Sequence, residues 1–230
     1  RLTTFHNDPV GDGTGEAFYI RDDETGAFWS PTPLPARGRS GYECRHGFGY
    51  SVFEHYESSI FSEMTTYVAM DAPVKFVVVK LRNRSGRARR LSLTGYWELV
   101  LGEWRHANLM HVVTEKDAGS GALFARNPYS RQRPGRVFFA QAAEVRRTVT
   151  GNRTEFIGRN GSLASPAAMR RTRLSGRTGA GLDPCAAIQT QVELADGQER
   201  EVVFVIGAAG NRHEAQQLLQ RFASSAGARR

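Results

Sequence analysis

Seven side chains of the kinds that bind sugars lie in or beside predicted loops of this chain. A sugar site combines aromatic rings, which stack on the C–H faces of sugars, with planar polar groups that make paired hydrogen bonds to neighbouring hydroxyls. The candidates that supply these groups are Trp29, Arg45, His46, Tyr50, Trp104, Arg126 and Asn127. Core packing is the alternative for each aromatic residue taken alone. Their recurrence beside arginines and carboxylates in several separate loops favours carbohydrate recognition.

Two short motifs bring polar candidates to places where a ligand can approach. In Arg45-His46-Gly47-Phe48-Gly49 the two glycines allow close contact with a ligand or another domain, and the imidazole could donate to a sugar oxygen. A structural histidine at a tight strand start is the alternative. In Arg126-Asn127-Pro128 the proline forces the preceding residue out of helical geometry, so both polar side chains should project from a sheet edge. A surface ion pair is the alternative for Arg126.

The sequence assigns no catalytic residue and no metal ligand. A glycosidase needs two carboxyl groups about 5 to 9.5 Å apart across the scissile bond. The acidic run 22–24 fits a solvated turn better, and Glu54 and Glu57 fall near a strand end. The sequence contains no HExxH pair, Cys/His cluster, nucleophile elbow, phosphate-binding loop or dinucleotide fingerprint. We therefore expect no cofactor, and whether the chain is itself an enzyme stays open.

The chain is basic, with a formal net charge of +8. A nucleic-acid-binding module is therefore an alternative, because cationic surfaces bind polyanions through counterion release. It would use the arginines of segments 82–90 and 170–177. Neither segment has the interleaved aromatic residues that stack on bases, and the first fits a hairpin turn. We expect no nucleic-acid partner.

The spacing of strand-like segments predicts an all-β protein. Short runs rich in β-branched and aromatic residues alternate with Gly, Pro, Asn and Asp clusters, which is typical of a large antiparallel β-sandwich of about a dozen strands. The expected elements are a hairpin of 16–20 with 27–30, an exposed loop over 31–41, two strands within 47–70 that meet at 57–59, a pair of 73–81 with 91–101, and strands over 110–114, 121–125, 136–144, 155–157, 186–194 and 200–206.

The last part of the chain contains fewer strand signals. Residues 158–184 read as a long functional loop, because connections of that length are uncommon without a task. Asn211 with Glu214 three residues later predicts the start of a short C-terminal helix. We therefore place the sandwich at 1–208, and the helix with the start of a linker at 209–230.

Two features bear on the compartment. No run of about 18 apolar residues is present, so nothing here is expected to span a bilayer. Cys44 and Cys185 lack metal-ligand spacing, and we interpret them as two buried thiols of a reducing compartment. A cytoplasmic location is the resulting expectation, and any membrane anchor of a longer parent would lie outside this segment.

The chain resembles a known family over nearly its whole length. Its aromatic and acidic first third, up to residue 50, is similar to the amino-terminal β-sandwich of glycoside hydrolase family 94, the inverting phosphorylases once grouped as glycosyltransferase family 36. Within that family it looks most like the carboxy-terminal region of cyclic β-1,2-glucan synthases. The segments that carry this likeness are 123–129, 156–161 and 174–185.

The resemblance implies a galactose-mutarotase-like supersandwich cut from a larger enzyme. Family members continue into a helical linker and an (α/α)6 barrel that holds the catalytic aspartate and the site for inorganic phosphate, their co-substrate. It also implies that the sandwich lends loop residues to the sugar subsite, within a subunit or across a homodimer. The expected function is therefore carbohydrate binding and substrate orientation for a barrel that acts on β-linked glucans. A purely structural spacer or dimerisation domain is the remaining alternative.

Overall fold

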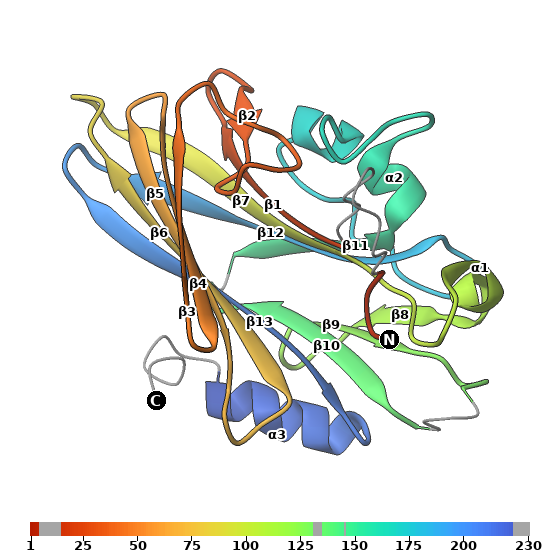
Figure 1. The fold of residues 1–230 in the computed structure, drawn as a ribbon. Helices are drawn as coiled ribbons and strands as arrows, with labels where there is room; N and C mark the ends of the chain where they lie inside the picture. Colours follow the sequence, from red (N-terminus) through yellow and green to blue (C-terminus); the bar gives the residue numbers. More distant parts are fainter. Residues whose placement is uncertain (5–14, 131–134, 145, 223–230) are drawn as a thin grey trace.

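The computed structural model describes residues 1–4, 15–130, 135–144 and 146–222. Within them the chain forms two antiparallel sheets (Figure 1). The strands are β1 Glu16–Asp22, β2 Phe28–Trp29, β3 Tyr42–Gly47, β4 Tyr50–Glu57, β5 Ile60–Val68, β6 Val74–Asn83, β7 Arg89–Glu98, β8 Val113–Lys116, β9 Leu123–Arg126, β10 Val137–Ala142, β11 Arg147–Asn152, β12 Pro184–Leu194 and β13 Glu199–Ala209. The helices are α1 Arg105–Asn108, α2 Arg153–Ile157 and α3 Arg212–Phe222, with 3₁₀ turns η1 Leu109–His111 and η2 Ala167–Arg170.

The two sheets pack face to face around an apolar core. One sheet has the strand order β11-β12-β7-β1-β2, and the other has the order β3-β4-β5-β6-β13-β10-β9-β8. Phe204 of the second sheet meets Phe18 and Trp97 of the first, with ring centroids 5.7 and 6.2 Å apart. The Trp97 contact is edge-on, a favoured geometry for aromatic rings, and the two contacts tie the layers together. The all-β sandwich prediction is confirmed.

Helix α3 covers the outer face of the larger sheet, as Figure 1 shows. Asn211 caps its first turn, since the Oδ1 of Asn211 accepts from the backbone N–H of Glu214 at 2.9 Å. The Glu214 carboxylate in turn accepts from the backbone N–H of Gly210 at 2.7 Å. Phe222 of the helix packs on Phe76 of β6 with ring centroids 5.2 Å apart. The predicted cap and helix are confirmed, while residues 223–230 of the predicted linker lie outside the described residues.

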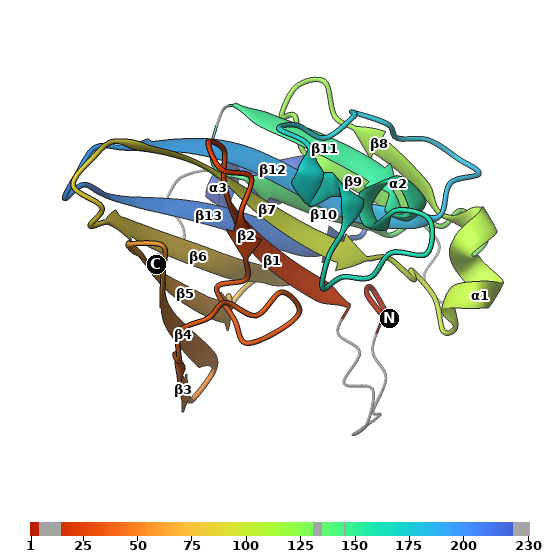
Figure 2. The ribbon, with the colours of Figure 1, turned by 90° about the horizontal axis from the view of Figure 1, so that it is seen from above.

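A second layer covers the outer face of the smaller sheet. The segment from α2 through η2 lies over it (Figure 2), and Phe156 stacks on Tyr96 at 4.6 Å while lying 6.1 Å from Tyr19. The predicted loop over 158–184 contains no strand before Pro184, where β12 begins. It is nevertheless packed onto the sheet, since Met169 and Leu174 are buried.

Two predictions were wrong, and two strands were missed. The strands β6 and β7 do not pair, since they lie in different sheets. The segment 155–157 belongs to helix α2, because Asn152 accepts from the backbone N–H of Glu155 and so caps a helix where Phe and Ile suggest a strand. Strand β3 was missed because its side chains are mostly exposed and show no apolar alternation. Strand β11 was also missed, since its sequence Arg-Thr-Val-Thr-Gly-Asn contains a single apolar side chain.

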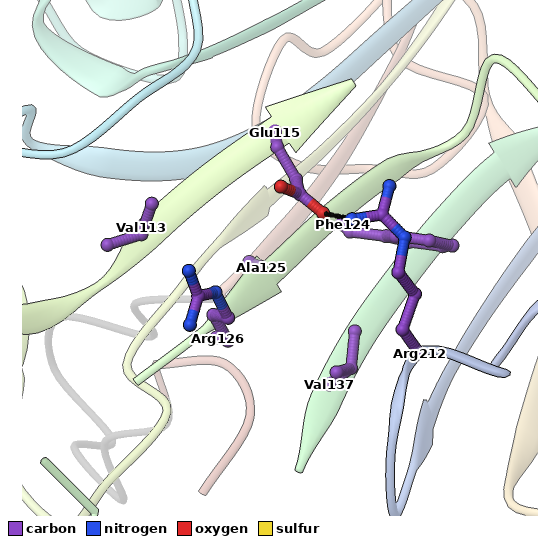
Figure 3. A pocket seen from close by; sticks show the side chains of 7 residues that line it. All are labelled: Val113, Glu115, Phe124, Ala125, Arg126, Val137 and Arg212. Carbon is purple, nitrogen blue, oxygen red and sulfur yellow. Dashed lines mark hydrogen bonds and ion pairs between the residues drawn. The ribbon is translucent and has the colours of Figure 1, made fainter. Parts of the chain in front are cut away.

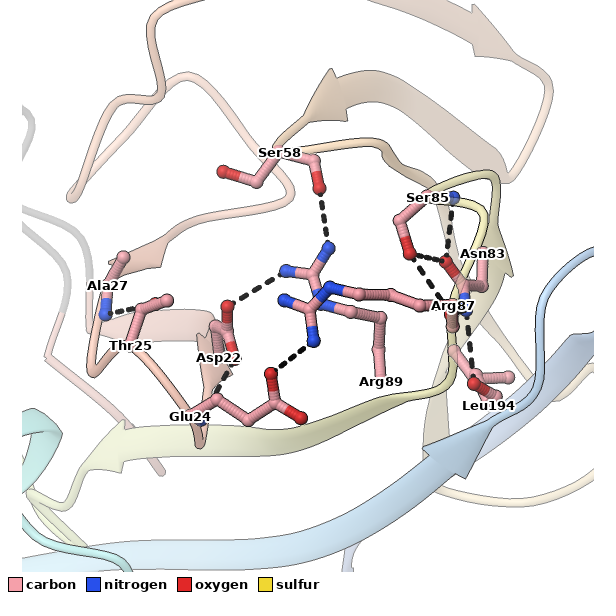
Figure 4. A network of polar contacts seen from close by, with 10 residues as sticks. All are labelled: Asp22, Glu24, Thr25, Ala27, Ser58, Asn83, Ser85, Arg87, Arg89 and Leu194. Carbon is pink, nitrogen blue, oxygen red and sulfur yellow. Dashed lines mark hydrogen bonds and ion pairs between the residues drawn. The ribbon is translucent and has the colours of Figure 1, made fainter.

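The connection between β6 and β7 crosses from one sheet to the other. It runs beside the β12–β13 turn, and Asn83 joins the two, donating from Nδ2 to the carbonyl oxygens of Leu194 and Ala195 at 3.1 Å. Figure 4 shows the polar contacts around this crossing. Arg89 is buried there and pairs with Asp22 at 2.8 Å, while Arg87 pairs with Glu24. Two arginines of the predicted nucleic-acid segment are thus already neutralised by carboxylates.

Candidate functional site

The structure divides the predicted site residues into separate groups. Arg45, His46 and Tyr50 lie on the β3–β4 hairpin, whereas Arg126 ends β9. Strands β5, β6, β13 and β10 lie between β4 and β9 in the same sheet, so these two strands are about 24 Å apart at the usual strand spacing. The seven candidates therefore do not form a single site.

Trp29 is a core residue rather than a surface residue. Only 2% of it is exposed, and it packs in the cluster between the two sheets. Its indole is enclosed because β2 pairs with β1 and turns this side chain inward. The expectation that Trp29 offers a face to a sugar is therefore wrong for this domain.

The candidates on the β3–β4 hairpin are largely occupied by one another. Arg45 bridges Glu43 and Glu54, each at 2.5 Å, which raises the pKa of its guanidinium. His46 shares a 2.8 Å hydrogen bond between Nδ1 and Ser51 Oγ. The Tyr50 ring lies against Gly47, where an added Cβ would come within 2.3 Å of it. The polar groups of Arg45 and His46 therefore bond to other residues of the same hairpin.

Asn127 and Trp104 belong to a second group, at the end of the sandwich next to α1. Asn127 is 5% exposed and donates from Nδ2 to the carbonyl oxygen of Leu101 at 3.1 Å and to Oδ1 of Asn108 at 2.9 Å. Asn108 donates from its own Nδ2 to the carbonyl oxygen of Trp104 at 2.7 Å. The buried amide of Asn127 thus holds the loop that carries Trp104, and it presents no group to solvent.

An ion-pair network fixes helix α1 to the sheet. Arg105 pairs with Glu98 at 2.9 Å and with Asp183, and Arg153 pairs with Glu98 at 2.7 Å. Burial of Glu98 would raise its pKa, but the hydrogen bond from Arg153 and the charges of both arginines outweigh burial and leave the pKa below its usual value. A helix of four residues has little stability of its own, so these ion pairs define where Trp104 sits.

Exposed aromatic and apolar side chains gather at this end. Trp104 is 54% exposed, Met110 is 69% exposed and Tyr129 is 73% exposed. His111 packs on Tyr129 with ring centroids 4.9 Å apart. We call the group formed by Trp104, Met110, His111, Arg126 and Tyr129 the α1 end; His111 is half-buried and the other four side chains are exposed. Such a set offers aromatic faces for stacking beside a guanidinium that donates several hydrogen bonds.

Two cavities flank the α1 end. One, of about 250 Å³, is lined in part by Leu101, Asn127 and Phe138. The other cavity has a volume of about 240 Å³ and lies on the outer face of β8, β9 and β10. In it, Arg126 faces the ion pair of Arg212 and Glu115 across an apolar floor (Figure 3). Arg126 has no ion pair within the part of the chain that the structure describes, so its guanidinium is available to a ligand.

Sequence reasoning selected Trp104, Arg126 and Asn127 but missed Asn108 and His111. The signal in the sequence was weak, because both residues lie between two strand candidates in a segment that forms only short helical turns and has no clear helical periodicity.

Within the described ranges no group of three or more His, Cys, Asp and Glu side chains could hold a metal ion. Among those residues, too, every helix falls short of the length and apolarity needed to cross a bilayer.

Comparison with known sequences decides the family. The model described as "Glycosyl hydrolase 94, supersandwich domain" matches residues 1–225. The chain belongs to this family. The supersandwich domain is 38% identical over 223 residues to the cyclic beta-(1,2)-glucan synthase NdvB of Rhizobium meliloti (strain 1021), a match that covers 96% of this chain and 8% of that protein. These matches confirm the resemblance seen in the sequence.

Two phosphorylases are also similar to the supersandwich domain. The solabiose phosphorylase of Paenibacillus borealis is 32% identical over 91% of this chain, and the N,N'-diacetylchitobiose phosphorylase of Vibrio furnissii is 28% identical over 93%. The match spans 28% of the length of each. The chain is therefore a domain of the kind found in carbohydrate-active enzymes, and it corresponds to less than a third of each of these relatives.

Proposed function

We propose that this chain is the carbohydrate-binding, substrate-orienting domain of a glycoside phosphorylase or glycosyltransferase that acts on β-linked glucans. The observation that carries the proposal is the α1 end, where buried Asn127 holds the loop that carries exposed Trp104, and the unpaired guanidinium of Arg126 lies at the end of β9. Family membership supports it, because relatives are named for a β-1,2-glucan and for disaccharides.

In this proposal the domain works with an (α/α)6 catalytic barrel of the same protein. Trp104 and Tyr129 would stack on sugar rings, and Arg126 would donate to neighbouring hydroxyls. Closing one wall of the site would exclude water, so that inorganic phosphate rather than water attacks the anomeric carbon. The domain needs no catalytic residue for this, and it would act in the cytoplasm.

A second candidate role is a docking surface for another domain or for a second copy of the chain. Phe48 is 107% exposed at the β3–β4 turn and Met70 is 104% exposed after β5, and the pairing of Tyr50 with Tyr67 puts both at the same tip of the sheet. Apolar side chains gathered on a surface are typical of protein contacts. This observation favours a structural role for that tip, and it leaves the α1 end free for sugar.

Calorimetric titration of the 230-residue chain with β-1,2-linked and β-1,4-linked gluco-oligosaccharides tests the proposal. We expect saturable binding that Trp104→Ala weakens about tenfold through loss of stacking. Phe48→Ala is the control, since it removes an exposed aromatic ring from the β3–β4 turn, which lies far from α1 at one edge of the larger sheet. Equal weakening by both variants, or binding that neither changes, would count against the α1 end as the sugar surface.

A further inference from the structure

A polar groove lies at the edge of the smaller sheet, away from both the α1 end and the β3–β4 hairpin. It lies where β11 and β12 meet the segment 171–176, and it consists of two adjoining hollows of about 410 and 450 Å³ that share Arg147, Thr148 and Arg173. The first is completed by Arg146, Thr172, Gln189 and Gln191, and the second by Lys116, Val149, Arg171, Leu174, Ser175 and Gly176. We call the two together the β11 groove.

The β11 groove concentrates positive charge. Its lining holds five cationic side chains and no carboxylate, and these are Lys116, Arg146, Arg147, Arg171 and Arg173. Among the described residues only Arg171 of these five has an ion pair, with Glu155 at 2.7 Å. Like charges this close repel one another, and an anion between them would remove that repulsion.

Arg147 is the cation held most deeply. It is partly buried, and its guanidinium donates to the carbonyl oxygens of Ser120, Ala142 and Glu144 rather than to a carboxylate. Burial lowers the pKa of this guanidinium. The carbonyl dipoles fix the position of the guanidinium without cancelling its charge, so the wall of the groove keeps a rigid positive centre that no carboxylate neutralises.

Gln189 adds a neutral donor to the wall of the groove. The residue is 2% exposed, and its Oε1 accepts from Thr148 Oγ1 at 3.3 Å. Its Nε2 has no hydrogen-bond partner among the described residues. A buried donor without a partner costs about 1 to 3 kcal/mol, and an acceptor bound in the groove would relieve that cost.

We propose that the β11 groove binds a compact oxyanion of the phosphate class. Arginine forks and a buried amide N–H all present donors, which suits a small tetrahedral group with several acceptor oxygens. No aromatic residue lines either hollow, so the groove offers nothing for a sugar face or a nucleic-acid base to stack on. The inference rests on this groove alone and does not depend on the proposed carbohydrate role.

The test is calorimetric titration of the 230-residue chain with inorganic phosphate at constant ionic strength, with sodium chloride as the blank. We expect saturable binding that Arg173→Gln and Arg146→Gln each weaken about tenfold, because each removes a charge-assisted hydrogen bond. Both side chains are exposed, so neither change should unfold the domain. Arg170 is an exposed arginine that directly precedes the segment 171–176 and lies outside the groove lining, so Arg170→Gln should change the affinity by less than about twofold.

Further titrations identify the chemical source of the anion and distinguish a specific site from general attraction to a basic surface. Tighter binding of glucose 6-phosphate than of inorganic phosphate would assign the groove to a phosphate ester, and the reverse order would assign it to the free ion. Gln189→Leu should weaken the binding of either ligand, because it removes the unpartnered amide donor from the groove wall. Absence of saturable binding, equal weakening by Arg170→Gln, or tight binding of a short oligonucleotide that phosphate fails to displace would overturn the proposal.

Discussion

The side-chain amide of Asn127 donates to Oδ1 of Asn108 at 2.9 Å, and this bond connects the end of β9 to helix α1. The same Nδ2 holds the carbonyl oxygen of Leu101, whose φ of 44° lies in the left-handed region that a branched residue rarely adopts. Asn108 then reaches back to the carbonyl oxygen of Trp104. An exposed tryptophan is thus positioned by a buried asparagine two hydrogen bonds away.

Asn127→Asp should loosen this loop while keeping its shape. The carboxylate can still accept from the backbone N–H of Tyr129, but it cannot donate to Leu101 or Asn108. We expect a loss of about 1 to 3 kcal/mol in the free energy of unfolding, measured by chemical denaturation. Gln217→Glu on the exposed face of α3 is the control and should change little. Stability equal to that of the unmodified chain would mean that Asn127 does not hold the α1 end.

The buried pair of Arg89 and Asp22 should matter far more than the exposed pair of Arg87 and Glu24 beside it. The side chains of the first pair are 5% and 3% exposed, so Arg89→Met leaves an uncompensated buried carboxylate. We expect a loss of about 3 to 5 kcal/mol for Arg89→Met and of at most about 1 kcal/mol for Arg87→Met. Thermal and chemical unfolding of the two variants give the comparison directly. Similar losses of unfolding free energy for the two variants would contradict the burial of the Arg89–Asp22 pair.

Asp117 should make the domain sensitive to acid. Burial would raise its pKa, but hydrogen bonds from Arg212 and Ser120 outweigh it and lower the pKa to about 2. Because the folded pKa lies below the unfolded one, the resulting stability is present above about pH 4 and is lost as pH falls toward about 2. Asp117→Asn should therefore show a flatter decline of unfolding free energy over that window. An unchanged slope would show that other carboxylates dominate.

The two cysteines should react at very different rates, which corrects the expectation that both are buried. Cys44 is exposed on β3, whereas Cys185 is buried and burial raises the pKa of its thiol. A thiol reagent should modify one cysteine per native chain quickly and the second only at the rate of unfolding. Cys44→Ser should remove the fast phase and leave the slow one. Two fast equivalents in the native protein would contradict the burial of Cys185.

Local patterns in the sequence predicted local structure well. Alternating residues located β4 and β5, and Asn211 with Glu214 located the start of α3. Strand partners were harder, since the pairs β6 with β13 and β7 with β12 join segments far apart in the chain, and a strand's own apolar pattern does not name its partner. The adjacent strands β6 and β7 were therefore paired wrongly.

The candidate site could be predicted only in part for the same reason. Trp104 and Arg126 were selected by residue type and loop position, and they lie exposed at the α1 end. Trp29 has the same residue type and loop position, yet it is buried, because burial depends on which sheet lies opposite. The β11 groove assembles residues from four separate segments, and single-residue patterns give no sign that these meet.

An amide and indole chemical-shift titration of the 230-residue chain with β-1,2-linked and β-1,4-linked gluco-oligosaccharides is the most direct test of the central claim. The proposed function predicts localised shifts of the Trp104 indole and of residues around Arg126 and Tyr129, stronger with one linkage, while the β3–β4 hairpin stays unchanged. Shifts confined to the hairpin around Arg45, or no shift with either sugar, would contradict the assignment of the α1 end as the carbohydrate-binding surface.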